Sequence, residues 1–435
     1  MKGMKQDKFV IQGLGGKKKL AGEIKVKGAK NAVLPVMASS ILFEDGFQLT
    51  NVPEIEDIRR LTEIFAGLGI KIKKQSEGEY LIDASQINKT AEIDEEASKK
   101  MRASVIFTGP LLARFGELIF PHPGGCVIGA RPIDLFLEGF EKMGATTQIK
   151  KGKYFVKVRG GKLKGAEIFF KIPSVTATET FIMAGVLATG KTILQNVALE
   201  PEIISLIDFL NLCGARIKGA GTPTLEISGG VLLKANGHQY KTIPDRLEAG
   251  SFLILGALCA TDLKICDCYP THLKILIEFL KDSGARIEVG EDYIRVKNSS
   301  KQQTHFKSFN LKTHEYPGFP TDLQSPTVVY LTQAVGESLV FETIFEGRLN
   351  YTADLVKMGA NIKMWDAHRA TIVGPTPLRG RELEGPDIRT GFAFVIAALV
   401  ADKKSIINNV YYIDRGYEQI EKRLRKIGAE IKRVS

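Results

Sequence analysis

A pattern of about seventy residues recurs six times along the chain, and it constrains the fold more than any other feature of the sequence. Each copy contains an apolar stripe at helical spacing, then a glycine, then a short strand. Ile203, Leu206 and Leu210 form such a stripe before Gly214. Glycine just beyond an apolar stripe is typical of a helix C-terminus. The recurring glycines are at positions 69, 144, 214, 284, 359 and 428, with separations of 75, 70, 70, 75 and 69 residues.

A second helix is expected near the middle of every copy, and its apolar residues are distributed nearly all around it. Helices of that kind are buried, so the pattern predicts helices inside and sheets outside. Each unit therefore has the order strand, helix, strand, helix, strand. The predicted positions of the second helix are residues 31–42, 102–115, 178–188, 246–260, 322–335 and 388–401.

The domain organisation follows from the length of the chain and the phase of the repeat. A chain of 435 residues exceeds the usual size of one hydrophobic core, so two α/β domains of three units each are expected. The last unit lacks closing strands, whereas the first unit is preceded by strands expected within residues 9–27. We therefore predict one discontinuous domain of residues 1–29 and 243–435, and a second domain of residues 30–242.

The loop of residues 123–132 has the sequence P-G-G-C-V-I-G-A-R-P and is the strongest candidate for chemistry. Its glycines permit a close approach of the backbone to a ligand, and its prolines restrict the turns. On such a loop Cys126 would be accessible, and Arg131 could stabilise its thiolate and bind an anion. The alternative is a packed, unreactive cysteine, which is common for this residue type.

The formal net charge of +11 favours anionic partners, but the distribution of the lysines argues against nucleic acid. The clusters at 17–19 and 99–100 are short and lack interleaved aromatic residues.

Residues 252–260 are apolar but shorter than a membrane span, so no membrane association is expected. The absence of an apolar segment in residues 1–8 and the odd number of 5 cysteines predict reduced thiols and a cytoplasmic protein.

Two motif matches are rejected because of their context. Residues 185–192 read G-V-L-A-T-G-K-T, which fits a phosphate-binding loop. A helix is expected before this segment and a strand after it, which is the reverse of the order that such a loop requires. Cys266, Cys268 and His272 lack a second pair of ligands, so no metal site is expected.

Charged residues lie at the starts of several of the expected buried helices. Free amides and the helix dipole bind anions at such positions. Simple capping explains aspartate and asparagine there, but it explains Lys30, Arg102 and Arg389 poorly, because cations are unfavourable at a helix N-terminus without an anion. If these N-termini converge, they form an anion-binding site.

Seven segments together match one known family. They are residues 28–32 (GAKNA), 101–104 (MRAS), 123–132, 200–202 (EPE), 244–246 (PDR), 319–322 (FPTD) and 414–417 (DRGY). Over nearly its whole length the chain resembles the UDP-N-acetylglucosamine 1-carboxyvinyltransferases, which are enolpyruvyl transferases. The resemblance implies two inside-out, barrel-like α/β domains with the active site in the cleft between them. It also implies transfer of the enolpyruvyl group of phosphoenolpyruvate to the 3′-hydroxyl of UDP-N-acetylglucosamine, with release of phosphate, in peptidoglycan precursor synthesis.

The resemblance assigns roles to individual residues. Cys126 matches the proton donor to the enol carbon and the target of epoxide inhibitors, and Asp322 matches the carboxylate that takes the proton of the sugar hydroxyl. Lys30, Arg131 and Arg415 match residues that hold phosphoenolpyruvate. The other matching substrate contacts are Asn31, Arg102, Pro132, Ile133, Asp134, Leu135, Ser174, Val175, Ile344, Asp387 and Arg389, and Arg131 also matches a contact to the UDP-sugar. The two small molecules are the expected partners, no cofactor is implied, and we expect a monomer.

The chain departs from the family pattern at four positions, none of which removes a catalytic group. Thr176 replaces a glycine and bears on diphosphate binding, and Gly347 replaces an asparagine near a sugar contact. Thr390 replaces an alanine, and Phe136 stands where some relatives have histidine.

Two alternative functions share features with this sequence. The first is 3-phosphoshikimate 1-carboxyvinyltransferase, which shares the fold, but its Ala-Gly-Thr-Ala segment is replaced here by residues 101–104. The second is a non-catalytic paralogue that binds UDP-sugar. The presence of all the matching catalytic residues argues against it; these are Lys30, Cys126, Asp322 and Arg415.

Overall fold

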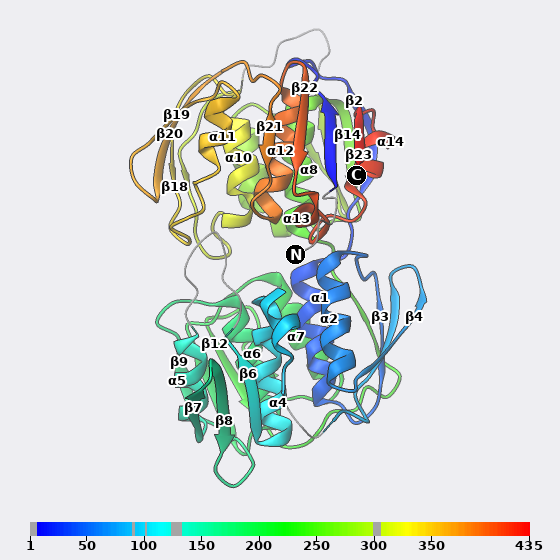
Figure 1. The fold of residues 1–435 in the computed structure, drawn as a ribbon, viewed down its shortest axis with the longest axis vertical. Coiled ribbons are helices and arrows are strands. Elements are labelled where there is room, and N and C mark those ends of the chain that lie inside the picture. Colours follow the sequence, from blue (N-terminus) through cyan, green and yellow to red (C-terminus); the bar gives the residue numbers. More distant parts are fainter. Residues whose placement is uncertain (1–6, 89–91, 101, 123–132, 299–305) are drawn as a thin grey trace. The chain divides into compact units, whose positions relative to one another are not determined.

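The computed structural model describes residues 7–88, 92–100, 102–122, 133–298 and 306–435. These residues form two compact units (Figure 1). The discontinuous unit combines the residues up to Lys27 with Pro244–Ser435, and the continuous unit extends from Gly28 to Ile243 within the described ranges. In these described ranges, no helix is both long enough and apolar enough to cross a membrane.

The recurring glycines end the outer helices of both units, as the repeat predicts. All six have positive φ, from 76° at Gly69 to 110° at Gly359, which is a conformation that glycine adopts without strain. After the helix of residues 274–282, the amide of Gly284 donates to Lys281 O at 2.8 Å and that of Ala285 donates to Leu280 O at 2.9 Å. This pair of hydrogen bonds is the Schellman motif, which ends a helix with a residue of positive φ. The glycine recurs because it adopts this conformation with the least strain.

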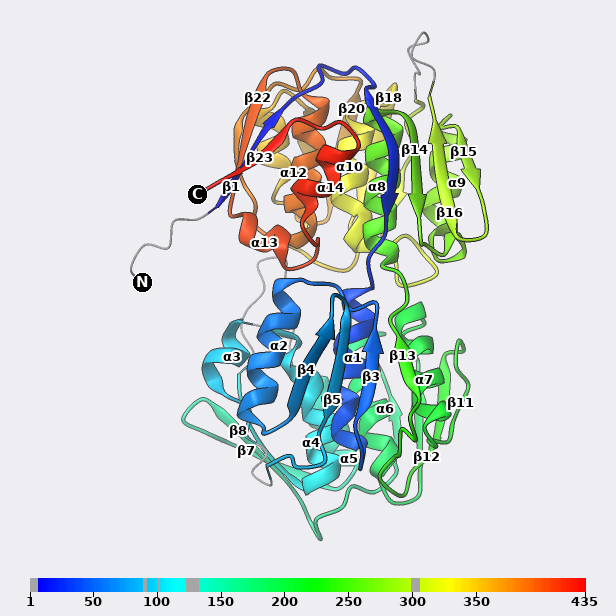
Figure 2. The same ribbon diagram turned by 90° about the vertical axis from the view of Figure 1, so that its right-hand side faces the viewer.

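The predicted apolar helices form the interior of each unit, which confirms the expected α/β class with buried helices and outer sheets. In the discontinuous unit, α8 (Arg246–Cys259) and α10 (Gln324–Leu331) are buried along their whole length, and α12 (Ile388–Val400) is buried except at its first residue. These three helices pack against one another inside the sheets of that unit (Figure 2). In the continuous unit, α6 (Val175–Leu187) has the corresponding buried position.

The four-stranded sheets share one plan in which a parallel pair of strands is extended by antiparallel strands, whereas both strand pairs of the three-stranded sheet are antiparallel. Among the described residues there are five four-stranded sheets and one three-stranded sheet. One sheet has the order β15-β16-β14-β2, with β15 at Ile287–Val289. In it, β14 (Ala260–Cys266) pairs in parallel with β2 (Leu20–Lys25) and antiparallel with β16 (Tyr293–Lys297). The sheets thus surround the buried helices, which form the core of each unit.

The first two strands of the chain belong to two different sheets of the discontinuous unit. β1 (Lys8–Gln12) lies between β22 (Lys404–Asn408) and β23 (Ile431–Val434), antiparallel to both. β2 instead pairs with β14, so the two N-terminal strands are not hydrogen-bonded to each other. A sequence pattern predicts that these segments are strands, but it does not specify which sheet each one enters.

Two of the predicted buried helices begin with a tighter 3₁₀ turn. In the continuous unit, η2 (Arg102–Phe107) precedes α4 (Thr108–Phe115). In the discontinuous unit, η4 (Thr321–Leu323) precedes α10. The remaining helices and strands of the continuous unit are α1 (Lys30–Ser39), η1 (Ser40–Leu42), β3 (Phe47–Thr50), α2 (Glu56–Gly67), β4 (Lys71–Ser76), β5 (Glu79–Asp83), α3 (Glu95–Lys100), β6 (Glu117–Pro121), α5 (Asp134–Lys142), β7 (Ala145–Lys150), β8 (Lys153–Val158), β9 (Glu167–Phe169), β10 (Lys191–Gln195), α7 (Pro201–Leu212), β11 (Ile217–Lys218), β12 (Thr224–Ser228) and β13 (Gln239–Lys241).

The discontinuous unit contains shorter outer helices and the edge strands of its sheets. Its remaining elements are η3 (Pro270–Leu273), α9 (Lys274–Asp282), β15 (Ile287–Val289), β17 (Leu311–Lys312), β18 (Gly336–Phe341), α11 (Thr352–Lys357), β19 (Asn361–Met364), β20 (Arg369–Gly374), β21 (Glu382–Glu384), α13 (Val410–Asp414) and α14 (Ile420–Lys426).

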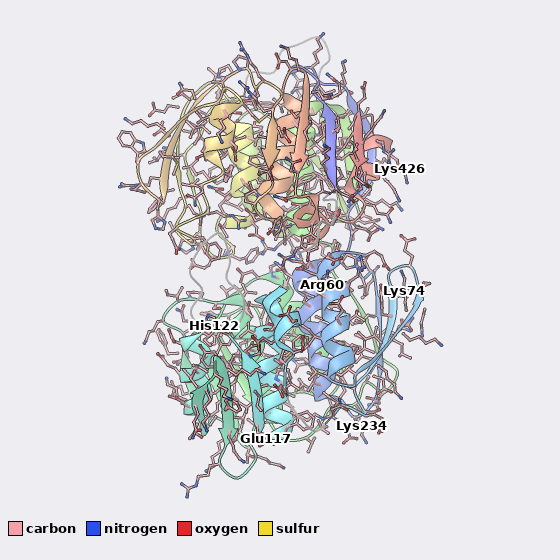
Figure 3. All side chains as sticks on the ribbon, viewed as in Figure 1. Arg60, Lys74, Glu117, His122, Lys234 and Lys426 are labelled. Atoms are coloured by element: carbon pink, nitrogen blue, oxygen red, sulfur yellow. The ribbon has the colours of Figure 1, made fainter. Side chains whose placement is uncertain are left out.

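Exposed lysines occur in several separate segments of the described chain. Lys74, Lys234 and Lys426 extend outward from different parts of the chain (Figure 3). Two of these three are ion-paired, Lys74 with Glu54 at 2.8 Å and Lys234 with Glu44 at 3.2 Å. Part of the positive charge is therefore compensated locally on the surface.

Candidate active site

Asp322 lies between two buried arginines in the discontinuous unit. Its Oδ1 accepts a hydrogen bond from Arg348 Nη2, and its Oδ2 accepts one from Arg389 Nε, both at 3.0 Å. Each arginine side chain is 3% exposed, whereas that of Asp322 is 29% exposed. The predicted base is thus a solvent-accessible carboxylate whose orientation is fixed by two cations behind it.

Arg389 lies in the first turn of α12, where a cation is normally unfavourable. Asp387 caps this helix, with Oδ1 accepting from the amides of Arg389 at 2.9 Å and Thr390 at 3.1 Å. The carboxylates of Asp322 and Asp245 compensate the cation, and the ring centroid of Tyr417 lies 5.6 Å from its guanidinium carbon. Burial lowers the pKa of Arg389, but the attraction of Tyr417 and Asp322 raises it more. The structure therefore shows Asp387 as the N-terminal cap of helix α12.

Arg348 is a site residue that the sequence analysis did not single out. It is buried close to three carboxylates, and although burial lowers its pKa, the charges of Asp322, Asp387 and Glu342 raise it overall. An arginine four residues after the predicted sugar contact Ile344 was the available signal. The signal was weak, because nothing local in the sequence links position 348 to position 322.

Two further predicted residues of this unit lie on loops or helix ends. Ile344 is half-buried, and its amide donates to Glu342 Oε1 at 2.9 Å. Arg415 is half-buried at the C-terminal end of α13, two residues before Tyr417. The ring of Tyr417 is fully buried, and its hydroxyl lies 3.1 Å from Ser251 Oγ.

In the continuous unit, the predicted phosphoenolpyruvate contact Lys30 begins helix α1. Its Nζ lies 3.4 Å from Asp57 Oδ2, and the two side chains are 14% and 3% exposed. A nearly buried aspartate thus compensates the charge of Lys30. This explains why a cation is tolerated at the helix N-terminus, which capping alone does not explain. Asn31 follows it in α1 and is half-buried.

The predicted UDP-sugar contacts of the continuous unit divide into helix-start residues and packed residues. Ser174 caps α6, and its Oγ accepts from the amide of Ala177 at 3.3 Å, so its side chain has a structural role there. Val175 is half-buried in the first turn of the same helix.

Ile133 is buried, Asp134 is exposed at the start of α5, and Leu135 packs against the core. Cys126, Arg131, Pro132 and the side chain of Arg102 lie outside the described residues.

Glu179 is a second residue that the sequence analysis missed. It lies in the middle of the apolar helix α6 and is 4% exposed, with Oε1 unpartnered among the described residues. Burial, together with the nearby charges of Glu202 and Glu200, raises the pKa of Glu179 well above its usual value. A charged residue type inside a helix that is otherwise apolar was the signal for it.

The four described cysteines are buried or half-buried thiols. Burial raises the pKa of Cys213 to about 11 and that of Cys259 to about 12. Cys268 is buried, and Cys266 is the one half-exposed thiol of the described residues, also with a raised pKa. The described residues contain no group of three or more His, Cys, Asp or Glu side chains suited to a metal ion.

Comparison with known proteins identifies the family to which this fold belongs. The sequence profile of the EPSP synthase family, 3-phosphoshikimate 1-carboxyvinyltransferase, matches residues 14–424. The enolpyruvyl transferase NikO from Streptomyces tendae superposes with a TM-score of 0.87 at 22% identity over 99% of both chains. EPSP synthase from Acinetobacter baumannii gives 0.73 at 19% identity, covering 99% of this chain and 100% of that one. The chain therefore belongs to the EPSP synthase family, that is, to the enolpyruvyl transferases.

Within this class, sequence identity is much higher to one group. The UDP-N-acetylglucosamine 1-carboxyvinyltransferase of Koribacter versatilis is 43% identical, covering 98% of this chain and 96% of that protein. The protein of the same name from Desulforapulum autotrophicum is 42% identical, covering 98% of this chain and 100% of its own. These matches confirm the resemblance that the seven segments indicated.

Proposed function

We propose that this chain transfers the enolpyruvyl group of phosphoenolpyruvate to the 3′-hydroxyl of UDP-N-acetylglucosamine and releases phosphate, the first committed step of peptidoglycan precursor synthesis. The observation that carries the proposal is the 43% identity to enzymes of that name over nearly the full chain. The placement of Asp322 between Arg348 and Arg389 supports it, because a fixed, accessible carboxylate suits the removal of a hydroxyl proton.

The proposed roles follow the chemistry of the two substrates. Asp322 takes the proton of the sugar hydroxyl, whose oxygen bonds to the central carbon of phosphoenolpyruvate, while Cys126 gives a proton to the terminal carbon. Loss of phosphate and of a proton from that carbon then restores the double bond. Lys30, Arg131 and Arg415 hold the phosphate and carboxylate of phosphoenolpyruvate, because both groups require cations. The proposal thus assigns groups of both units to one reaction.

The proposed partners are these two small molecules, and we propose a cytoplasmic, monomeric enzyme. The remaining predicted contacts to the UDP-sugar, including Arg102 and Arg131, belong to the same proposal. So do the predicted domain boundaries at residues 29 and 243, with the active site assigned to groups from both domains.

A phosphate-release assay with two acceptors tests the function. The purified chain is incubated with phosphoenolpyruvate and either UDP-N-acetylglucosamine or shikimate 3-phosphate. We expect phosphate only with the first acceptor. Release with shikimate 3-phosphate alone would establish the alternative that the family profile names. Binding of UDP-N-acetylglucosamine without any phosphate release would instead indicate a non-catalytic paralogue.

A further inference from the structure

The carboxylate of Glu342 is completely buried next to the candidate site, and its two oxygens bind two different segments. Glu342 directly follows strand β18 and is 0% exposed. Burying a carboxylate is costly unless hydrogen bonds satisfy its oxygens. Both oxygens of Glu342 accept hydrogen bonds here. The partner of one is Thr321, which precedes Asp322, and the partners of the other include the amide of Ile344.

The first oxygen fixes the turn that carries Asp322. Glu342 Oε2 accepts a hydrogen bond from Thr321 Oγ1 at 2.9 Å. Thr321 is the first residue of η4, and Asp322 is the next. A short helix start has few backbone bonds of its own, so this side-chain bond restricts the direction in which Asp322 projects.

The second oxygen fixes the backbone at the predicted sugar contact. Glu342 Oε1 accepts from the amides of Ile344 at 2.9 Å and Phe345 at 3.3 Å. The carbonyl of Phe345 in turn accepts from the amide of Arg348 at 3.1 Å. Because Arg348 donates to Asp322, the bonds form a closed circuit from Asp322 through Thr321, Glu342 and the 344–348 turn back to Asp322.

The backbone around Glu342 is held independently of its carboxylate. The amide of Glu342 donates to His368 O, and the carbonyl of Glu342 lies 2.8 Å from His368 Nδ1. The next residue, Thr343, donates through Oγ1 to Thr313 O at 2.6 Å and through its amide to Thr313 Oγ1 at 2.9 Å. Substitution of the carboxylate therefore leaves its own strand end anchored.

We propose that Glu342 is a positioning residue that holds the base Asp322 and the backbone at Ile344 in one fixed relation, so that the acceptor hydroxyl meets the carboxylate. This inference rests on the proposed function, since Asp322 and Ile344 are assigned to the sugar substrate there. One oxygen of Glu342 governs the chemistry through Thr321. The other governs sugar binding through the amides of residues 344 and 345.

The two arms predict different kinetic signatures in the phosphate-release assay. Thr321→Val keeps the shape of the side chain but removes the hydroxyl, and we expect kcat to fall about tenfold with an unchanged KM for phosphoenolpyruvate. Thr321→Ser restores the hydroxyl and should restore kcat. Glu342→Gln keeps one acceptor oxygen for two donor segments, so we expect a several-fold rise in KM for UDP-N-acetylglucosamine together with a lower kcat.

A matched control comes from the same strand. Glu337 is exposed at the other end of β18, and Glu337→Gln should leave kcat and both KM values unchanged. If Thr321→Val and Glu342→Gln lower only the melting temperature and keep the kinetics of this control, the role is structural and the inference is wrong. If the unmodified chain releases no phosphate with UDP-N-acetylglucosamine, the proposed function fails, and the inference fails with it for that separate reason.

Discussion

At the scale of single residues, charge compensation explains how cations lie at the starts of buried helices. Removing a cation from water is costly, and only close, well-aligned carboxylates repay that cost. Arg389 has Asp322 within 3.0 Å, and Lys30 has Asp57 within 3.4 Å. The protein's own carboxylates therefore compensate both of these cations.

Asp322→Asn removes the proposed base while keeping its size. We expect kcat to fall by about 10²–10⁴, which is the usual contribution of general-base catalysis, with a much smaller change in affinity for UDP-N-acetylglucosamine. Steady-state phosphate release and calorimetric titration measure the two quantities. The control is Asp366→Asn, which removes a carboxylate paired with Arg369 at 2.6 Å on an exposed part of the same unit. Equal activity of the two variants would exclude Asp322 as the base.

Cys126 should be the thiol that an epoxide analogue of phosphoenolpyruvate, such as fosfomycin, alkylates. We expect one adduct, formed faster with UDP-N-acetylglucosamine present, because the raised pKa values of Cys213 and Cys259 keep these thiols protonated. Cys126→Ser should lose the adduct and at least about 90% of turnover, whereas Cys126→Asp should retain turnover because a carboxylic acid still donates a proton. Peptide mass mapping locates the adduct; finding it on Cys213, Cys259 or the half-exposed Cys266 would contradict the assignment.

Glu179→Gln should stabilise the protein increasingly as the pH rises. Burial and two neighbouring glutamates raise the pKa of Glu179 in the folded state, so the folded state binds more protons than the unfolded chain. Stability therefore falls with rising pH from the unfolded pKa up to the folded one, and the neutral glutamine removes that loss. Melting temperatures between about pH 5 and about pH 8 measure the difference between variant and parent.

The control for this titration is a half-exposed glutamate of the same unit. Glu226 on strand β12 pairs with Lys191 at 2.8 Å, and the hydrogen bond from that lysine lowers the pKa of Glu226. Glu226→Gln should not gain stability as the pH rises. A difference for Glu179→Gln that stays constant across the pH range would show that this carboxyl does not titrate as its burial predicts.

At the scale of elements, Lys27 is the last residue of the discontinuous unit before the chain enters the other unit, and its amide, carbonyl and side chain each bind a residue of the discontinuous unit. The amide of Lys27 donates to Glu248 Oε2 at 2.9 Å, its Nζ lies 2.8 Å from Glu418 Oε1, and its carbonyl accepts from the amide of Asp245. Arg423 completes the network by donating to both oxygens of Glu248, at 2.6 and 2.9 Å. Gly28 follows, where a Cβ would lie 1.8 Å from Asn51 O, so only glycine fits.

Glu248→Gln should strongly destabilise the discontinuous unit, because Glu248 is 2% exposed and Arg423 would lose its charged partner. Breaking one side of a buried pair typically costs about 3–5 kcal/mol. The matched control is Asp262→Asn, since Arg295 binds Asp262 in the same bidentate manner with side chains 35% and 42% exposed. We expect a much smaller loss there, because solvent screens an exposed ion pair. Scanning calorimetry compares the two variants, and equal losses would contradict the argument from burial.

At the scale of the whole molecule, local rules determined much of the fold. The six glycines predicted helix ends because a left-handed residue is needed there whatever the surroundings, and all six have positive φ. The continuous apolar content of residues 246–260 and 388–401 likewise predicted the buried helices α8 and α12. These features depend only on neighbours within a few turns of chain.

Long-range pairing was not accessible to the same rules. Asp322 meets Arg348 and Arg389 across 26 and 67 residues of sequence, and no periodicity links those positions. For that reason Arg348 and Glu342 were missed, although the resemblance supplied Asp322 and Arg389. The sequence also did not predict that β1 and β2 enter two different sheets, because the residue pattern of a strand does not specify which strand it pairs with.

The placement of β1 between β22 and β23 also has a consequence for synthesis on the ribosome. The first strand emerges early, but its partner β23 begins at Ile431, so at about 5–20 residues per second the nascent strand waits roughly 20–80 s. During that time Phe9 and Ile11, both 0% exposed in the finished protein, have no core to enter. The continuous unit can complete its sheets meanwhile, since β13 supplies the partner of β3 before α8 is translated. Strand β1 is therefore synthesised long before β23, the partner that completes its pairing in the sheet.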